Sequence, residues 1–517
     1  MLLRRLLRLA PAFLLPKPAT ASNSTSLPGT RPCDALAAAG LGDILLAPTD
    51  SGYEPQMATW WSLNAQLRPW CLVLPRSTAE VSLVLTTLVA AGHGAGSWHI
   101  AVRSGGHGWP GSNSVVNGVT IDLSHLNATR YDAAANRARL QPGARWEHAY
   151  AALQAQGNVT VAGGRDGGVG VGGFLLGGGI SFFSGRHGFG CDSVVNYEVV
   201  LADGSVVYAN ATAHADLWRA LKGGAGNFGI VTRYDLQAIP STPLLYELRY
   251  LAANYSSAVV DAVVDYAGRN ASYGDDALVT FYSHDVSISP AGDTVIGVIH
   301  VNTLGNADSE EIFDGLKELP ALVNVTARET MADAAAGSKL PGGTLNAGST
   351  RTFKNNPAIL RYCVQLHEQL VASLTQSIGA DSFTTLMFLQ PIPAYLGRLG
   401  PQQLNGGGVA NMLGLENMTD GAVIWTGGIG VSTGGEAALA VAQAALNAMS
   451  AQVASFAQSV GGLVDLVYLN YADPSQDPLG SYGADNVAFL RRVAAEYDPN
   501  GVFQSRVPGG FKISRVG

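Results

Sequence analysis

A single histidine stands among glycines at the point where an apolar run ends. The segment 100–113 reads IAVRSGGHGWPGSN, in which His107 is flanked by Gly105, Gly106 and Gly108. Glycine lets the backbone pass close to a bound group and adopt positive φ without strain, and the amides of such a loop can bind an anion. The pattern indicates an imidazole held against a large ligand, although a strand that simply ends in a turn has the same signature.

A second group of reactive side chains lies near the C-terminus, in the segment YLNY at 468–471. On a strand, Tyr468 and Asn470 would point to one side and Tyr471 to the other. A tyrosine can take a proton from an alcohol when a positive neighbour or hydrogen bonds stabilise its charged form. Core packing is the alternative explanation for these tyrosines.

The elements that must position these residues fall into two sections with different patterns. From about 70 to 240, short strand-like runs alternate with turns and helices, including a helix near 77–92 and a hairpin over 195–210. From 242 to 465, longer strand-like runs and long helices predict a second α+β layer. The stretch 337–349 is expected to be a surface loop.

Composition limits the classes of protein to which the chain can belong. Of its 517 residues, 47% are hydrophobic and 14% are charged, which excludes disorder and suffices for more than one core. The net charge is −8 and no long basic block is present, so nucleic acid is not expected as a partner. No segment after the N-terminus approaches the roughly 18 unbroken apolar residues of a membrane span. The oligomeric state is left open.

The N-terminus predicts a secretory signal peptide over residues 1–21, in which three arginines precede a short apolar segment and Ala19-Thr20-Ala21 offers a cleavage site. An amphipathic transit peptide is the alternative. Secretion is supported by sequons for N-glycosylation, which begin at Asn23, Asn127, Asn158, Asn210, Asn254, Asn270, Asn324 and Asn417.

The chain has four cysteines, and an oxidising compartment permits disulfides. Cys33 and Cys71 are the expected pair, because they flank one N-terminal segment. Cys191 and Cys363 either pair or remain buried thiols, and the sequence leaves both alternatives open.

Three sequence blocks together resemble a known family. They are VRSGGHGWPGSNSVVNGVTIDLS at 102–124, LWRALKGGAGNFGIVT at 217–232, and the tail YLNYADP…YG…YDPNGVF at 468–503. In this order they resemble flavin oxidases of the vanillyl-alcohol oxidase type, and more narrowly the berberine-bridge-enzyme-like FAD-linked oxidases. The resemblance covers most of 70–240 and the chain from 466 onward, whereas the middle matches little.

The resemblance implies an α+β fold with a PCMH-type FAD-binding domain and a substrate domain whose antiparallel sheet is covered by helices. The expected divisions are a signal peptide at 1–21, an N-terminal extension at 22–69, the FAD-binding domain at 70–241, the substrate-binding domain at 242–465, and a C-terminal segment at 466–517 that returns to the FAD domain.

The family also implies a role for the histidine among glycines. There, the histidine of RSGGH is bonded to the 8α-methyl carbon of the flavin, and the matching residue is His107. The protein positions and tunes the flavin, which carries out the redox chemistry. The residues expected to bind FAD are His107, Arg103, Ser104, Gly105, Gly106, Gly108, Gly163, Gly164, Asp166, Val169, Gly170, Gly172, Gly173, Gly229, Ile230, Tyr482 and Asn486.

The second glycine-rich loop, AGGRDGGVGVGGFLLGGG at 162–179, departs from the family. Many relatives have a cysteine there that forms a second bond to the flavin, and the aligned residue in this chain is Asp166. We therefore expect one covalent link, through His107. The residue that gates oxygen in the family falls on Val169, whose small side chain is consistent with oxygen reaching the flavin.

The same loop also fits a dinucleotide-binding fingerprint, with Gly168, Gly170 and Gly173 followed by Asp192 about 20 residues later. In that fingerprint the glycines open a helix, whereas GGFLLGGGISFF is a poor start for a helix. A flavin-binding or turn-forming loop is the favoured interpretation.

The family places a tyrosine and an asparagine of the YLNY segment at the active site. We expect Tyr468 to act as the base or its partner, and Asn470 to contact flavin or substrate. Further side chains in the strand-like runs of the middle section could face the flavin, although most such residues are packed in cores. They are His284, His300, Gln390 and Trp425.

Two other catalytic classes fit the sequence less well. Gly430-Val-Ser432-Thr-Gly434 matches the serine hydrolase motif between a strand-like run and a helix, but its histidine should follow the serine and the last histidine is His367. Neither H-x-x-H nor paired-cysteine spacing for a metal occurs. A non-catalytic secreted binding protein is a more distant alternative.

The sequence thus predicts a secreted FAD oxidase whose partners are a small-molecule substrate and O2. A CH–OH donor, either a carbohydrate or another alcohol, would give hydride to the flavin, and O2 would be reduced to hydrogen peroxide. A FAD-linked dehydrogenase or an oxidative cyclase of secondary metabolism is the alternative within the family.

Overall fold

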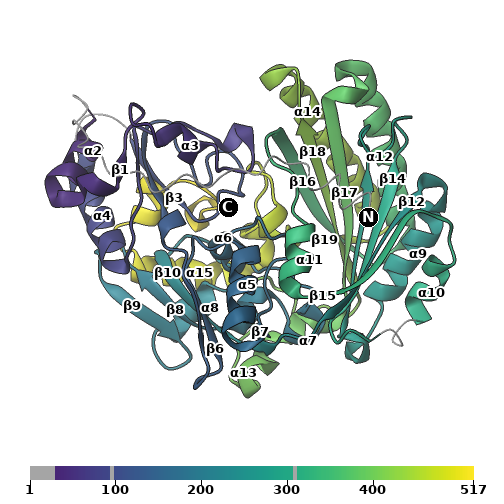
Figure 1. Cartoon of the computed structure of the whole chain (residues 1–517), viewed down its shortest axis with the longest axis horizontal. Coiled ribbons are helices and arrows are strands. Elements are labelled where there is room, and N and C mark those ends of the chain that lie inside the picture. The colour runs from purple at the N-terminus through teal and green to yellow at the C-terminus, as the bar shows by residue number, and fades with distance from the viewer. Residues whose placement is uncertain (1–29, 94–97, 307–310) are drawn as a thin grey trace.

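The computed structural model describes residues 30–517 apart from 94–97 and 307–310, and it shows two lobes side by side (Figure 1). The predicted signal peptide and the sequon at Asn23 lie outside the described residues. The α+β fold predicted for the chain is confirmed. The C-terminal segment, yellow in Figure 1, runs back beside the first lobe.

The first lobe contains two main sheets. The smaller pairs its last three strands in parallel and follows the order β1 (Leu45–Leu46), β2 (Cys71–Val73), β4 (Gly118–Asp122), β3 (His99–Arg103). The larger is antiparallel and follows the order β5 (Thr129–Asp132), β6 (Arg137–Leu140), β10 (Ile230–Gln237), β8 (Val194–Val200), β9 (Val206–Asn210). A short ladder joins β7 (Val159–Thr160) to β11 (Ile239–Pro240).

Local signals in the first lobe act as expected. The helix α4 (Thr78–Ala90) begins where the Ser77 side chain accepts a hydrogen bond from the Glu80 amide, which satisfies a free N–H of its first turn. Strands β8 and β9 form the predicted hairpin. The remaining helices of this lobe are α2 (Arg31–Leu36), α3 (Tyr53–Met57), α5 (Trp146–Gly157), α6 (Val171–Leu176), α7 (Ser184–His187), α8 (Ala215–Ala220) and α15 (Ala484–Tyr497).

The second lobe is an eight-stranded antiparallel sheet. Its order is β15 (Ala321–Glu329), β12 (Leu244–Ala252), β14 (Val295–Asn302), β13 (Asp276–Ser283), β17 (Phe383–Ile392), β18 (Ala422–Val431), β16 (Leu345–Lys354), β19 (Leu463–Val464). Its outer face is covered by α9 (Ser256–Ala267), α10 (Glu311–Lys317), α12 (Pro357–Ile378) and α14 (Gly435–Ser459) (Figure 1). Between the lobes lies α11 (Met331–Gly337), which packs on α5, and the short α13 (Gln403–Gly406) lies against the first lobe, at the 3₁₀ turn Gly190–Ser193.

Within the described residues, α14 is long and apolar enough to cross a membrane by length and composition alone. Its buried residues, including Leu446, Met449 and Val453, belong to the core between the sheet and its helices. The other positions of α14 are partly or fully exposed, so this is the packing of a helix that covers a sheet with one face.

The expectation of a surface loop over 337–349 is wrong for its second half, because β16 begins at Leu345. The outer edge of β16 is paired with side-chain amides where β19 does not reach. Asn64 bonds both the N–H and C=O of Asn346, Gln476 does the same at Thr350, and Gln443 donates to the carbonyl of Gly348. Two of these amides come from outside the eight-stranded sheet and its helices, so they tie the lobes together.

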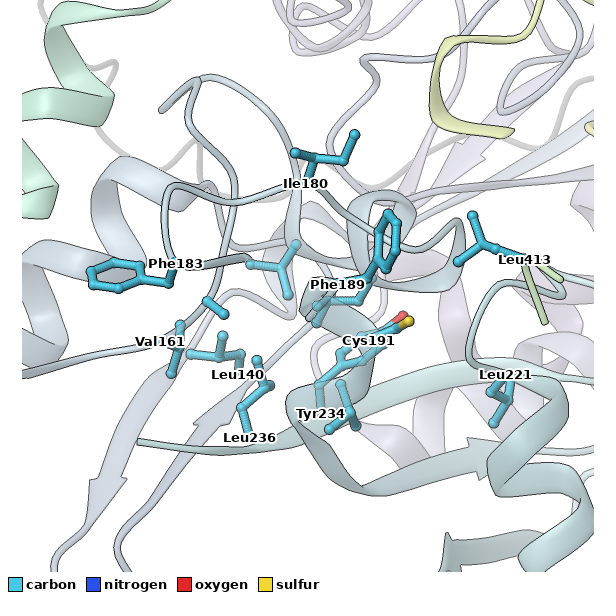
Figure 2. Packing of buried hydrophobic residues seen from close by; sticks show 14 of the residues in the cluster. Leu140, Val161, Ile180, Phe183, Phe189, Cys191, Leu221, Tyr234, Leu236 and Leu413 are labelled. Carbon is cyan, nitrogen blue, oxygen red and sulfur yellow. The ribbon is translucent and has the colours of Figure 1, made fainter. Parts of the chain in front are cut away.

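One hydrophobic core runs through the first lobe and into the second. Figure 2 shows part of it, with Leu140 and Leu236 from β6 and β10 near Phe189 and Cys191. The inner face of the large sheet joins the same core, for example through Ile424 of β18. The relative position of the lobes is therefore set by continuous packing.

The predicted disulfide between Cys33 and Cys71 is present and ties α2 to β2. Cys191 and Cys363 are free, buried thiols that belong to different core clusters. The alternative that these two pair is therefore excluded.

A buried charge cluster lies between the large sheet and α10. In its protonated form, His300 donates through Nδ1 to Glu247 (2.8 Å) and through Nε2 to Asp276 (3.2 Å), and its ring stacks on Phe313. Burial acts to lower the pKa of His300, but the bonds to Asp276 and Glu247 outweigh it and raise the pKa. The protonated form is thus the one that this site stabilises.

This cluster predicts a pH-dependent stability. A raised folded-state pKa gives stability that is complete below the unfolded value of about 6.5 and is lost as pH rises through the folded value. We expect the melting temperature of the protein to exceed that of His300→Gln by a margin that is largest below about pH 6.5 and shrinks as the pH rises above it. Thermal melts across this range measure it, and a margin that grows with pH would contradict the assignment.

Candidate functional site

His107 lies in the loop that follows β3, stacked on Trp61 with ring centroids 4.5 Å apart and planes inclined by 22°. Its Nδ1 is buried and has no hydrogen-bond partner among the described residues. Burial, with a smaller effect of the Arg145 charge, lowers the pKa of His107 to about 3. At neutral pH the imidazole is therefore uncharged and has a nitrogen lone pair available for bonding.

The cation beside His107 is Arg145, a residue that the sequence analysis missed. Its guanidinium donates to the carbonyls of Gly168 and Thr59 and so joins the second glycine loop to the N-terminal segment. Burial and the nearby Arg103 lower the pKa of Arg145 to about 10. The side chain remains a cation at neutral pH.

The two glycine loops pack directly on each other. A Cβ at Gly105 would lie 2.5 Å from the Cα of Gly170, and a Cβ at Gly172 would lie 2.8 Å from Oγ of Ser104. By contrast, a Cβ at Gly173 would meet nothing within 4 Å, so space is open there. The structure thus brings together the predicted residues of both loops.

Arg103, one of the residues expected to bind FAD, is paired inside the protein. Its Nη1 donates to Asp122 at 2.7 Å, Nη2 donates to Thr59, and the guanidinium lies 3.7 Å from the centre of the Trp60 ring. Both partners of the Arg103–Asp122 pair are almost completely buried. The charge of Arg103 is neutralised inside the protein, and its contacts hold the histidine loop to β4 and to the N-terminal segment.

Gly163 and Gly164 allow α5 to approach the second loop, because a Cβ on either would lie within 2.5 Å of the Trp146 ring. Asp166 accepts the amides of Gly168 (2.6 Å) and Leu340 (2.9 Å). Its carboxylate is thus committed to the backbone of both lobes. Burial raises the pKa of Asp166.

The second loop leads into α6, so the expectation that this stretch does not begin a helix is wrong. The strand before the loop, β7, pairs only with β11 and is antiparallel to it, which is not the parallel arrangement of a dinucleotide fold. A flavin-binding or turn-forming loop is therefore still favoured over a dinucleotide-binding fingerprint for this segment.

The YLNY segment is not a strand. Leu469–Tyr471 forms a 3₁₀ turn, which brings Asn470 back onto Tyr468, with the amide donating to the phenol oxygen at 3.2 Å. The same oxygen accepts the Gly179 amide, and burial raises the pKa of Tyr468 well above 10. Tyr468 has no described cationic partner, so the geometry does not favour it as a base.

Of the two tyrosines, Tyr471 is the one that has a positively charged neighbour. Its hydroxyl accepts a hydrogen bond from Nη2 of Arg165 at 2.9 Å. Nη1 of Arg165 donates to Oε1 of Gln390 on β17, and the Gln390 amide is held by the carbonyl of Leu278. A cation, a phenol and an amide from three separate segments meet where the inner face of the large sheet reaches the second glycine loop.

The other candidates of the middle section lie elsewhere. His284 stacks on Phe383 and both of its nitrogens contact carbonyl oxygens. His300 belongs to the charge cluster described above, and Trp425 packs in the core under the helices. Of the four candidates, Gln390 alone joins the site.

The remaining predicted residues form a separate group in the first lobe. Tyr482 donates to the carbonyl of Gly223, and Asn486 donates to the carbonyls of Tyr482 and Met412. Gly229 packs on β8 and Ile230 opens β10. Val169 is partly buried against the central core.

A cavity of about 240 Å³ opens beside the histidine loop. Trp109, two residues after His107, lies on Gly348 of β16, where a Cβ would come within 2.2 Å of the indole. The lining residues are Asn64, Trp109, Pro110, Asn346, Glu436, Leu439, Ala440, Gln443, Asp473 and Pro474. The cavity combines an aromatic surface with amides and carboxylates.

The rival motifs find no support in the geometry. Ser432 is exposed, and its hydroxyl contacts the carbonyl of Asp381. Within the described residues, no group of three or more His, Cys, Asp or Glu side chains could hold a metal ion.

The residues that are present fit a large cofactor at the two glycine loops. The unpartnered Nδ1 of His107, the side-chain-free contact of Gly105 with Gly170 and the open space at Gly173 are the observations that support this. Residues 69–210 also match the sequence model described as "FAD binding domain". FAD is therefore the cofactor that this lobe binds.

Comparison with known proteins covers almost the whole chain. The FAD-dependent monooxygenase drtC of Aspergillus calidoustus is 32% identical over 485 residues, which are 94% of this chain and 90% of that protein. The FAD-dependent monooxygenase sdcF of Emericella nidulans is 34% identical over 493 residues, with 94% and 98% covered.

Solved structures share the fold at lower identity. Glucooligosaccharide oxidase from Acremonium strictum superposes with a TM-score of 0.72 at 19% identity, covering 93% of this chain and 100% of that chain. A chitooligosaccharide oxidase gives 0.71 at 18% identity, with 93% and 99% covered. Together with the relatives, these matches show that the chain belongs to the berberine-bridge-enzyme-like FAD-linked oxidoreductases with a PCMH-type FAD-binding domain.

Proposed function

We propose that this FAD-linked oxidoreductase oxidises a carbon centre of a small secondary metabolite, with FAD attached to His107. The relatives that share about a third of its residues over nearly the whole chain are named FAD-dependent monooxygenases. The oligosaccharide oxidases share only the fold. The predicted alternative, a FAD-linked dehydrogenase or oxidative cyclase of secondary metabolism, is therefore better supported than the main prediction of an oxidase acting on carbohydrates or other alcohols.

The observation that carries this proposal is the Arg165–Gln390–Tyr471 group. Bound FAD supplies the acceptor for a hydride leaving the substrate carbon. Tyr471, whose hydroxyl oxygen accepts a hydrogen bond from Arg165, is the proposed group that takes the proton of the substrate hydroxyl. Gln390, fixed by Leu278, holds the guanidinium in place.

His107 contributes the attachment. Its uncharged imidazole and unpartnered Nδ1 support a single histidyl link, and Asp166, whose carboxylate binds two amides, offers no second one. Dioxygen is the proposed final acceptor. The disulfide between Cys33 and Cys71 supports an oxidising compartment and hence the proposed secretion.

A carbohydrate oxidase is the second candidate, and the cavity at Trp109 favours it. Sugars present apolar faces and many hydroxyls, and the cavity offers an indole beside Asn64, Asn346 and Glu436. The volume of about 240 Å³ suits one ring of either kind of substrate.

A substrate panel separates the two candidates. The purified protein is mixed anaerobically with benzylic and allylic alcohols or with glucose, chitin and xylose oligomers, and bleaching of the flavin absorbance is followed. Reduction by the small alcohols alone supports the proposal, whereas reduction by the oligosaccharides alone overturns it in favour of the second candidate. Mixing reduced protein with ¹⁸O-labelled O2 then shows whether oxygen leaves as peroxide or enters the product.

A further inference from the structure

The ring of His107 is held in an unusual way. No described residue forms a hydrogen bond to either ring nitrogen, although Nδ1 is buried. The torsion that turns an imidazole about its Cβ–Cγ bond has broad minima, so hydrogen bonds normally set the ring plane. Here the described contact that fixes the plane is the stacked indole of Trp61.

Trp61 is itself fixed at three points. Its backbone N–H donates to the carbonyl of Gly106, its carbonyl accepts the Gly343 amide, and its indole Nε1 donates to the carbonyl of Leu340. The first contact is in the histidine loop, and the other two are in the substrate-domain segment before β16. Hydrogen bonds to both lobes therefore fix the orientation of the indole independently of its stacking on His107.

The same segment is anchored to the second glycine loop. The Leu340 amide donates to Asp166, while the Leu340 carbonyl accepts from Trp61. The backbone of one residue, Leu340, is thus bonded both to the second glycine loop and to Trp61. This arrangement fixes the distance between Trp61 and the loops.

We propose that Trp61 is a positioning residue for the attachment of FAD to His107, an inference that rests on the histidyl link proposed above. By stacking, Trp61 holds the ring in the plane in which Nδ1 can bond. In the attachment, the imidazole loses its N–H proton, the flavin methyl carbon loses one hydrogen and a C–N bond forms. The two electrons released pass to dioxygen, which leaves as hydrogen peroxide.

The test compares Trp61→Phe with Trp61→Leu in the full-length chain. Both lose the indole N–H, but only phenylalanine keeps an aromatic face, so their difference isolates stacking. At successive times after induction, total FAD is extracted from each purified protein, and covalent FAD is measured by intact mass after denaturation. We expect Trp61→Phe to attach flavin at close to the wild-type rate and Trp61→Leu to attach it about 3- to 10-fold more slowly, with total FAD unchanged.

Equal rates of attachment in the two variants would overturn the proposal. If Trp61→Leu does not accumulate as folded protein, Trp61→Gln replaces it, because its amide can still donate to Leu340 while it lacks a ring. Slow attachment in Trp61→Gln supports stacking, and normal attachment refutes it. The wild-type protein reports separately on the histidyl link, because covalent FAD absent there refutes the attachment itself.

Discussion

Changing Tyr471 to phenylalanine is expected to slow flavin reduction by about 10²- to 10⁴-fold, the range that a positioned acid–base group contributes. The variant keeps the ring, which packs beside the core, and loses only the oxygen to which Arg165 donates. Anaerobic stopped-flow reduction with a donor from the panel measures the effect. The FAD content should stay at the wild-type level.

Tyr468→Phe is the matched control, since it removes the same atom from the neighbouring tyrosine. Its oxygen accepts bonds from the Gly179 and Asn470 amides inside the core, so its loss should lower the melting temperature and leave the reduction rate within a few-fold of wild type. If Tyr468→Phe abolishes reduction while Tyr471→Phe leaves it intact, the assignment is reversed and the original expectation for Tyr468 is restored.

Changing His107 to alanine should remove all covalently bound flavin. Wild-type protein precipitated in acid is expected to keep its yellow colour, and the variant to release FAD into the supernatant while still binding it before denaturation. The change removes the unpartnered Nδ1, and Asp166 leaves no second attachment point. Intact mass spectrometry of both proteins provides the measurement.

Asp166→Asn is the control for His107→Ala, because it changes the charge of the second loop and keeps an oxygen that can accept the Leu340 amide. It should retain the covalent flavin. Flavin still bound to denatured His107→Ala protein would place the attachment at another residue.

The sequence was informative where short-range chemistry decides structure. Ser77 begins a helix because its side chain accepts an amide of the first turn. The glycines around His107 predicted that the backbone passes close to a bound group, and the structure shows that Gly105 also lies directly against Gly170 of the second loop. The cysteine pair was identified for a similar reason, since Cys33 and Cys71 flank one segment.

The site itself depends on contacts between residues that lie far apart in the sequence. Arg165 lies 225 positions from Gln390 and 306 from Tyr471. A strand was expected over the YLNY segment, but the segment contains a 3₁₀ turn. As a result Tyr471, and not Tyr468, lies beside the arginine. An arginine beside Asp166, in a loop otherwise made of glycines and apolar residues, was the one signal that could have indicated the cation.

The amides that pair with the edge of β16 have a consequence for how a substrate enters. Opening the lobes like a hinge would detach Asn64 and Gln476 and expose a row of unpaired strand groups, which is a template for aggregation. It would also break a core that runs through both lobes. Substrate access must therefore come from local motion of side chains such as Trp109 at the rim, with the two lobes keeping their mutual orientation throughout turnover.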